Sequence, residues 1–144
     1  MTISREERIE SVKVGVIGGL AFCIAYGLTV AVHTLELPVL AAFQGNNTVE
    51  TALCWGAAWA SGFLFGVTYR YIVRDEDNPH LKSGAVAAFA IVRGVAPIEL
   101  ERDLSEHFLV WIIFGGESLF CCLCAFFAID LALRKGWVQR IGRG

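Results

Sequence analysis

The segment FLVWIIFGGESLFCCLCAFFAI, residues 108–129, decides the fold class of this chain. Its only charged residue is Glu117, near the middle of an otherwise apolar run. A helix needs roughly 20 apolar residues to cross the hydrocarbon core of a bilayer, and this segment supplies them. The segment therefore predicts a transmembrane helix that carries one carboxylate at depth.

Three other blocks of the sequence have the same character. Residues 14–32 and 51–69 contain no charged residue, and residues 83–98 contain only Arg93. The first block is long for the core of a signal peptide and lacks a small-x-small cleavage site, so we expect it to be retained. Residues 83–98 are short for a span, but Lys82 can snorkel at one end and Leu100 can extend the other.

These blocks predict an all-α fold, a polytopic membrane four-helix bundle that forms one transmembrane domain over residues 1–144. Hydrophobic residues make up 56% of the chain, charged residues only 18%, and the mean hydropathy is +0.57. A soluble domain is roughly a quarter charged. The expected helices cover about 12–34, 49–73, 81–99 and 105–133.

The Lys and Arg residues gather at alternate ends of the blocks. One basic cluster precedes the first block, a second lies between the second and third blocks, and a third follows the fourth block. They consist of Arg5, Arg8 and Lys13; of Arg70, Arg74 and Lys82; and of Arg134, Lys135, Arg140 and Arg143. Arg102 is the single Lys or Arg residue in the two remaining connections. Because basic loops stay inside, this pattern predicts four spans with both termini on the cytoplasmic or stromal side.

The two charges inside the blocks, Arg93 and Glu117, form the first candidate site. Counted from the outer ends of antiparallel helices at 1.5 Å per residue, their depths differ by about 6 Å, which an Arg side chain can cover. We therefore expect an intramembrane ion pair. It can act as a structural clamp that fixes helix register, or as a site for an ion, proton, polar ligand or lipid head group. In a third interpretation, one or both residues face a partner protein.

Histidines and cysteines are the other candidates for chemistry. His33 and His107 are expected at the outer interface, where they could ligate a pigment or a metal, although interfacial histidines usually have no ligand. Bound chlorophyll, carotenoid or lipid is compatible with this arrangement, and we assign no metal site. The five cysteines all lie inside blocks and are expected to pack as small apolar residues.

Small residues recur at the spacing of helix contacts within three blocks. Gly15 with Gly19, Gly62 with Gly66, and Gly84 with Ala88 are each four residues apart. Such pairs allow two helices to approach closely in a membrane. We therefore expect a closely packed bundle.

Residues 65–93, FGVTYRYIVRDEDNPHLKSGAVAAFAIVR, carry a resemblance to a known family. The Y-R-Y-x-x-R end of the second helix, the L-K-S-G start of the third and the later V-R-G resemble small four-helix integral membrane proteins of cyanobacteria and plant plastids. The resemblance implies a thylakoid or bacterial inner membrane and no particular reaction. It marks the connection on the inner side as a candidate interaction region: Tyr69, Arg70, Tyr71, Arg74, Asn78, His80 and Lys82.

Two functions follow as expectations. The first is an accessory or assembly subunit of a larger membrane complex, in a photosynthetic membrane if the resemblance holds. The alternative is a small oligomeric transporter or channel that uses Arg93 and Glu117, although the sequence shows no internal repeat and no polar stripe along a helix. The expected partners are the lipid bilayer and a membrane protein or a second copy of the chain, but no nucleic acid, since the net charge is −2. No catalytic motif points to an enzyme.

Overall fold

The computed structural model describes residues 4–36, 47–74, 78–96 and 108–141. These residues form four helices, with no strand among them. The helices are α1 (Arg5–Glu36), α3 (Thr48–Val73), α4 (Pro79–Val95) and α5 (Phe108–Arg134). The predicted all-α four-helix fold is therefore confirmed.

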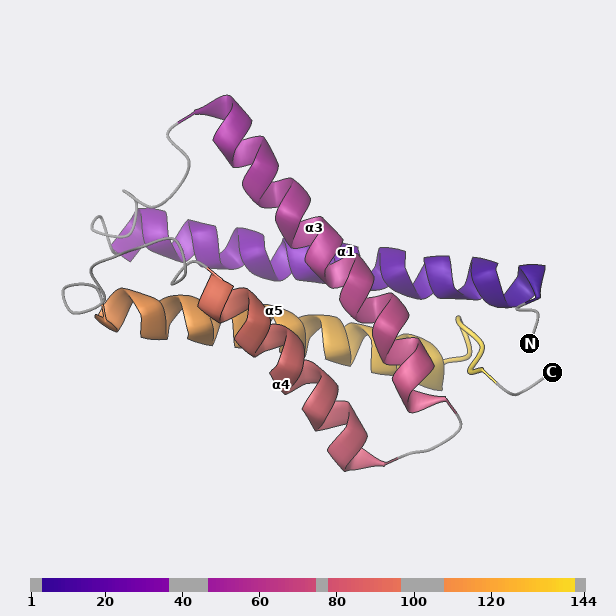
Figure 1. The fold of residues 1–144 in the computed structure, drawn as a ribbon. Coiled ribbons are helices and arrows are strands. Elements are labelled where there is room, and N and C mark those ends of the chain that lie inside the picture. Colours follow the sequence, from indigo (N-terminus) through magenta and orange to yellow (C-terminus); the bar gives the residue numbers. More distant parts are fainter. Residues whose placement is uncertain (1–3, 37–46, 75–77, 97–107, 142–144) are drawn as a thin grey trace.

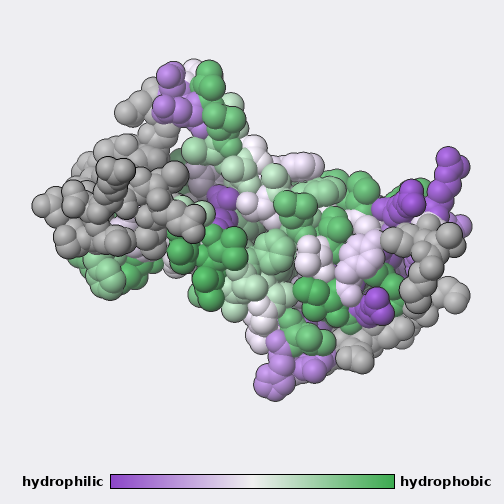
Figure 2. All heavy atoms as spheres, in the orientation of Figure 1, coloured by the Kyte–Doolittle hydropathy of each residue, from purple (hydrophilic) through white to green (hydrophobic). Residues whose placement is uncertain are grey.

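Three of these helices, α1, α3 and α5, are long and apolar enough to cross a membrane. They have 32, 26 and 27 residues, which exceeds the roughly 20 that a bilayer requires. Figure 2 shows hydrophobic surface over the middle of the molecule, with hydrophilic residues mainly toward its ends. Helix α4 has 17 residues and is the shortest of the four. Its predicted extension to residue 99, and the predicted start of α5 at residue 105, lie outside the described residues.

Helix α1 begins earlier than the predicted residue 12, and its first turn shows why. The backbone N–H of Ser4 donates to Glu7 Oε2, and the N–H of Glu7 donates to Ser4 Oγ, each over 3.2 Å. This reciprocal capping box satisfies two backbone donors that a helix start leaves open. Helix α4 is capped by Asn78, whose Oδ1 accepts from the N–H of His80 over 3.0 Å, and Pro79 occupies its first position.

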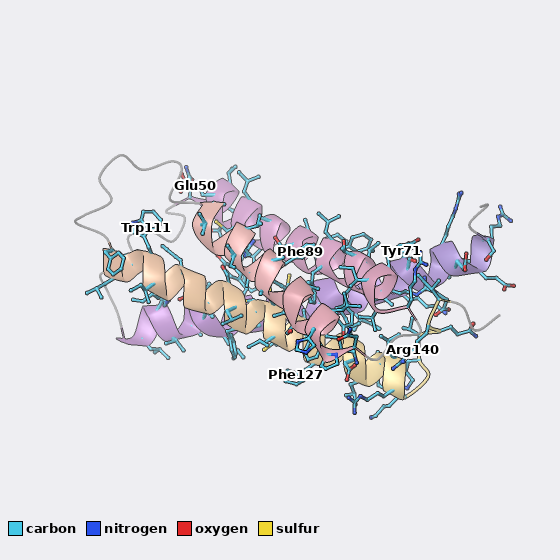
Figure 3. All side chains as sticks on the ribbon, turned by 60° about the horizontal axis from the view of Figure 1, so that its bottom comes forward. Glu50, Tyr71, Phe89, Trp111, Phe127 and Arg140 are labelled. Atoms are coloured by element: carbon cyan, nitrogen blue, oxygen red, sulfur yellow. The ribbon has the colours of Figure 1, made fainter. Side chains whose placement is uncertain are left out.

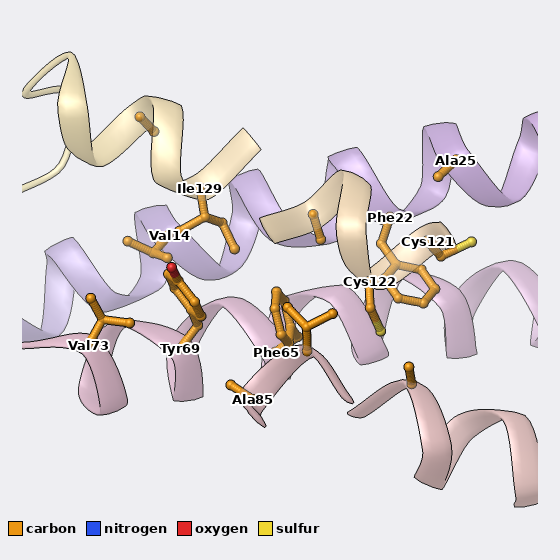
Figure 4. Packing of buried hydrophobic residues seen from close by; sticks show 14 of the residues in the cluster. Val14, Phe22, Ala25, Phe65, Tyr69, Val73, Ala85, Cys121, Cys122 and Ile129 are labelled. Atoms are coloured by element: carbon orange, nitrogen blue, oxygen red, sulfur yellow. The ribbon is translucent and has the colours of Figure 1, made fainter. Parts of the chain in front are cut away.

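Consecutive helices run in opposite directions through the bundle (Figure 1). Helix α1 packs chiefly on α3, and α5 packs on both α1 and α4. The core between them is built from aromatic, aliphatic and cysteine side chains (Figure 4). Its largest fully buried members are Tyr69, Phe22, Phe65 and Ile129.

Helices α1 and α3 cross at glycines. A Cβ atom added to Gly62 would clash with Cβ of Phe22 and lie 2.5 Å from the carbonyl oxygen of Gly18. A Cβ atom on Gly66 would lie 2.6 Å from the carbonyl oxygen of Val14. The two backbones are therefore in direct contact, as the spacing of Gly62 and Gly66 predicts. Gly84 differs, because a Cβ added there meets nothing within 4 Å.

Candidate functional site

A cavity of about 730 Å³ lies among the four helices. Phe22 of α1, Ser61 of α3, Arg93 of α4 and Glu117 of α5 all line it. Figure 3 shows another lining residue, Phe89, between the end of the bundle that carries Trp111 and the end that carries Tyr71 and Arg140. Both charged residues predicted inside the membrane are thus part of one cavity.

Arg93 reaches from α4 toward the middle of α3. Its Nη1 donates to Ser61 Oγ over 2.9 Å, and its Cζ lies 5.0 Å from the centroid of the Phe22 ring. The ring face attracts the cation and the hydroxyl accepts one of its five N–H bonds. Among the described residues, no carboxylate lies within ion-pair distance of Arg93.

Glu117 has a different partner, His33. The imidazole Nε2 of His33 and Oε1 of Glu117 are in direct contact between α1 and α5. The pair is largely shielded, since the side chain of His33 is 8% exposed and that of Glu117 is 19% exposed. A buried carboxylate requires such a partner, because desolvation without one is costly.

The direct Arg93–Glu117 contact expected from the sequence is therefore not formed. The two backbones are nearly level, since a Cβ on Gly94 would lie 2.9 Å from Cα of Gly115. In a helix, however, every side chain leaves the backbone tilted toward the helix N-terminus. Because α4 and α5 are antiparallel, Arg93 leans toward the start of α4 and Glu117 toward the start of α5. The side chains diverge, and each finds a partner on another helix.

The other predicted ligands are placed as follows. His33 pairs with Glu117, and the described residues contain no group of three or more His, Cys, Asp or Glu side chains that could hold a metal ion. His107 lies outside the described residues. All five cysteines are free thiols, and Cys54, Cys121 and Cys122 line the cavity. The indole N–H of Trp111, also a lining residue, has no hydrogen-bond partner in the part of the chain that the structure describes.

In the last turn of α3, Arg70 joins three parts of the chain. It is 3% exposed, although it is an arginine near the end of α3. Its Nη1 donates to the carbonyl oxygen of Glu7 over 2.9 Å and to Ser11 Oγ, and its Nε donates to the carbonyl oxygen of Gln139 over 3.1 Å. Arg70 thus holds the start of α1 and the segment after α5 against the end of α3.

The remaining residues of the predicted inner-side region do not form one surface. Tyr69 is fully buried and meets the ring of Phe126 edge-on, with centroids 5.6 Å apart. Lys82 pairs with Asp130 of α5 over 3.4 Å, and Asp130 also pairs with Arg134 over 2.6 Å. The sequence had not indicated the Lys82–Asp130 contact.

Four other members of that region lie at the surface. Tyr71, Arg74 and His80 are exposed, and Tyr71 accepts a hydrogen bond from Ser11 Oγ over 3.4 Å. Asn78 is exposed as well, and its Oδ1 forms the α4 cap described above. Tyr69, Arg70 and Lys82 therefore hold the bundle together, whereas Tyr71, Arg74, Asn78 and His80 offer polar groups at the surface.

Comparison of the chain with protein-family models, with curated proteins and with solved structures gives no match. The geometry described above is therefore the basis for assigning a function.

Proposed function

We propose that this chain is an accessory or assembly subunit of a larger membrane complex. The observation that supports this function is an unused helix-contact motif on α4. Gly84 and Ala88 are both exposed, and a Cβ atom on Gly84 would meet nothing within 4 Å. At the same four-residue spacing, Gly62 and Gly66 are in backbone contact with α1.

Contact with lipid does not require small residues, because lipid chains adapt to side chains of any size. Small pairs matter where a second helix approaches closely, as they allow backbones to pack. The Gly84–Ala88 pair therefore fits a helix from another chain. That chain can be a different membrane protein or a second copy of this one.

The membrane and the complex are further parts of the proposal. The resemblance of residues 65–93 supports a thylakoid or bacterial inner membrane and a photosynthetic complex as the partner. The basic clusters support an orientation in which both termini face the cytoplasm or stroma. Arg70, Lys82 and their neighbours would then lie on that side.

A native gel of gently solubilised membranes tests the proposal. The wild-type chain is expected to migrate with a large complex, whose other chains mass spectrometry then identifies. Gly84→Leu is expected to release the chain from that complex, since the added side chain fills the contact. Leu20→Phe is the control: it enlarges an exposed side chain on α1 and should leave co-migration unchanged.

The alternative, a small oligomeric transporter or channel, is favoured by one observation. Arg93 and Glu117 line the same cavity from different helices. Migration of the wild-type chain as a small homo-oligomer would overturn the subunit proposal and favour transport. Ion or proton flux in proteoliposomes, compared between wild type and Glu117→Gln, would then be the next measurement.

A further inference from the structure

The charge of Arg93 is the feature of the cavity that the fold does not explain. Its polar partner is the Ser61 hydroxyl and its aromatic partner is Phe22, both neutral. We infer that the cavity binds a single-chain amphiphile with an anionic head, whose carboxylate pairs with Arg93. This inference does not depend on whether the chain joins a complex.

The guanidinium lies at mid-height in the bundle. Its partner Ser61 is 13 residues after the first residue of α3 and 12 before the last. At 1.5 Å per residue, that places Ser61 about 18 to 20 Å from either end of the helix. A charge at the centre of a bilayer is costly even on the mildest scales. An anion beside Arg93 would offset this cost.

No carboxylate of the described residues forms an ion pair with Arg93. Glu117, on the neighbouring helix, pairs with His33. Glu10 and Asp130 pair with lysine or arginine elsewhere in the bundle. We therefore expect a bound ligand to supply the counter-ion.

The margin of the cavity indicates the route by which a ligand enters. Leu64 of α3 and Val92 of α4 both line the cavity, and they are 58% and 72% exposed. The cavity therefore opens between α3 and α4, on an apolar face. Figure 2 shows a small hydrophilic patch within the hydrophobic surface there. A ligand dissolved in the bilayer can reach this opening, whereas a water-soluble anion would first have to cross lipid.

Volume and chemistry define the class of ligand. A cavity of about 730 Å³ falls within the roughly 300–1,000 Å³ of small-molecule sites. Apart from Arg93, Glu117 and two serines, its walls are aliphatic, aromatic and cysteine side chains, which suit a hydrocarbon chain. The planar guanidinium can donate two parallel hydrogen bonds to a carboxylate. These features together favour a long-chain carboxylic acid.

Native mass spectrometry of the purified full-length chain in a neutral detergent tests the inference. Titration with hexadecanoate is expected to give a one-to-one adduct, whereas 1-hexadecanol, which lacks the charge, should bind at least 10-fold more weakly. Arg93→Gln is expected to weaken hexadecanoate binding by about 10-fold or more. Lys135→Gln removes an exposed cation outside the cavity and should leave binding unchanged.

A second measurement needs no variant. Cys54 lines the cavity, Cys124 does not, and both are partly exposed. Hexadecanoate is expected to slow alkylation of Cys54 by N-ethylmaleimide and to leave Cys124 unaffected. Equal binding of acid and alcohol, unchanged binding in Arg93→Gln, or no protection of Cys54 would overturn the inference. Binding of phosphatidylglycerol in place of hexadecanoate would overturn the single-chain assignment.

Discussion

His33 of α1 and Glu117 of α5 pair across the bundle, and this contact separates the two charges that the sequence places inside the membrane. The role of structural clamp therefore belongs to His33 and Glu117. Arg93, which lines the same cavity, is left with the neutral partners Ser61 and Phe22. The carboxylate of Glu117 thus joins two helices, and the guanidinium of Arg93 has only neutral partners among the described residues.

The clamp can be tested by removing one partner. His33→Ala leaves the Glu117 carboxylate shielded and without its partner, so we expect a loss of about 3 kcal/mol in the free energy of unfolding. Unfolding in mixed micelles of dodecyl sulfate and a neutral detergent measures this loss. The double substitution His33→Leu with Glu117→Leu removes both polar groups and should recover much of it. A loss below about 0.5 kcal/mol in His33→Ala would show that the pair does not stabilise the fold.

Arg70 provides a second prediction, on the opposite end of the molecule. Arg70→Lys keeps the charge but cannot reproduce the fork that reaches Glu7, Ser11 and Gln139. We expect a loss of about 2 kcal/mol and faster amide hydrogen exchange in residues 135–141. Arg74→Lys is the matched control, because Arg74 is exposed and should be neutral within about 0.5 kcal/mol. Unchanged exchange in Arg70→Lys would show that Arg70 does not hold the segment after α5 in place.

Local chemistry predicted much of this fold. The length of the apolar blocks indicated the four helices, and the start of α4 follows from Asn78 and Pro79, which need no tertiary contact to act. The i,i+4 spacing of Asp130 and Arg134 likewise favours a pair along one helix, and the structure shows that pair. Signals of this kind depend on neighbours along one helix, so one sequence is enough to find them.

The partner of Glu117 was not predicted, for a physical reason. Helical rise alone places Arg93 and Glu117 about 6 Å apart in depth, but it does not include the lean of side chains toward the N-terminus of each helix. It also does not show that α5 packs against α1, which brings His33 into reach. Ser61 was missed as well, since a single serine in an apolar block resembles any other small residue until its neighbours are known.

The third prediction compares a glycine in the crossing of α1 and α3 with a glycine on α5. Alanine is expected to change the free energy of unfolding in opposite directions at the two positions. Gly62→Ala adds a Cβ that clashes with Phe22 and Gly18, so we expect a loss of about 2 kcal/mol. Gly116→Ala adds a Cβ with nothing within 4 Å, and replacing a helical glycine should gain about 0.5 kcal/mol. The same unfolding titration measures both. Equal effects at the two positions would contradict the close approach.

The last prediction concerns the topology in the membrane. The start of α1, the end of α3 and the segment after α5 meet at Arg70, and the start of α4 meets the end of α5 through Lys82 and Asp130. All four helices therefore traverse the bundle.

If α4, with its 17 residues, also crosses the bilayer, both termini lie on one side. Because the basic clusters favour the cytoplasmic side for both termini, green fluorescent protein fused to either terminus should then fluoresce in bacterial cells, and alkaline phosphatase at the same positions should be inactive. Active phosphatase at one terminus alone would mean an odd number of crossings, and α4 would then be a helix that packs within the bundle without spanning the membrane.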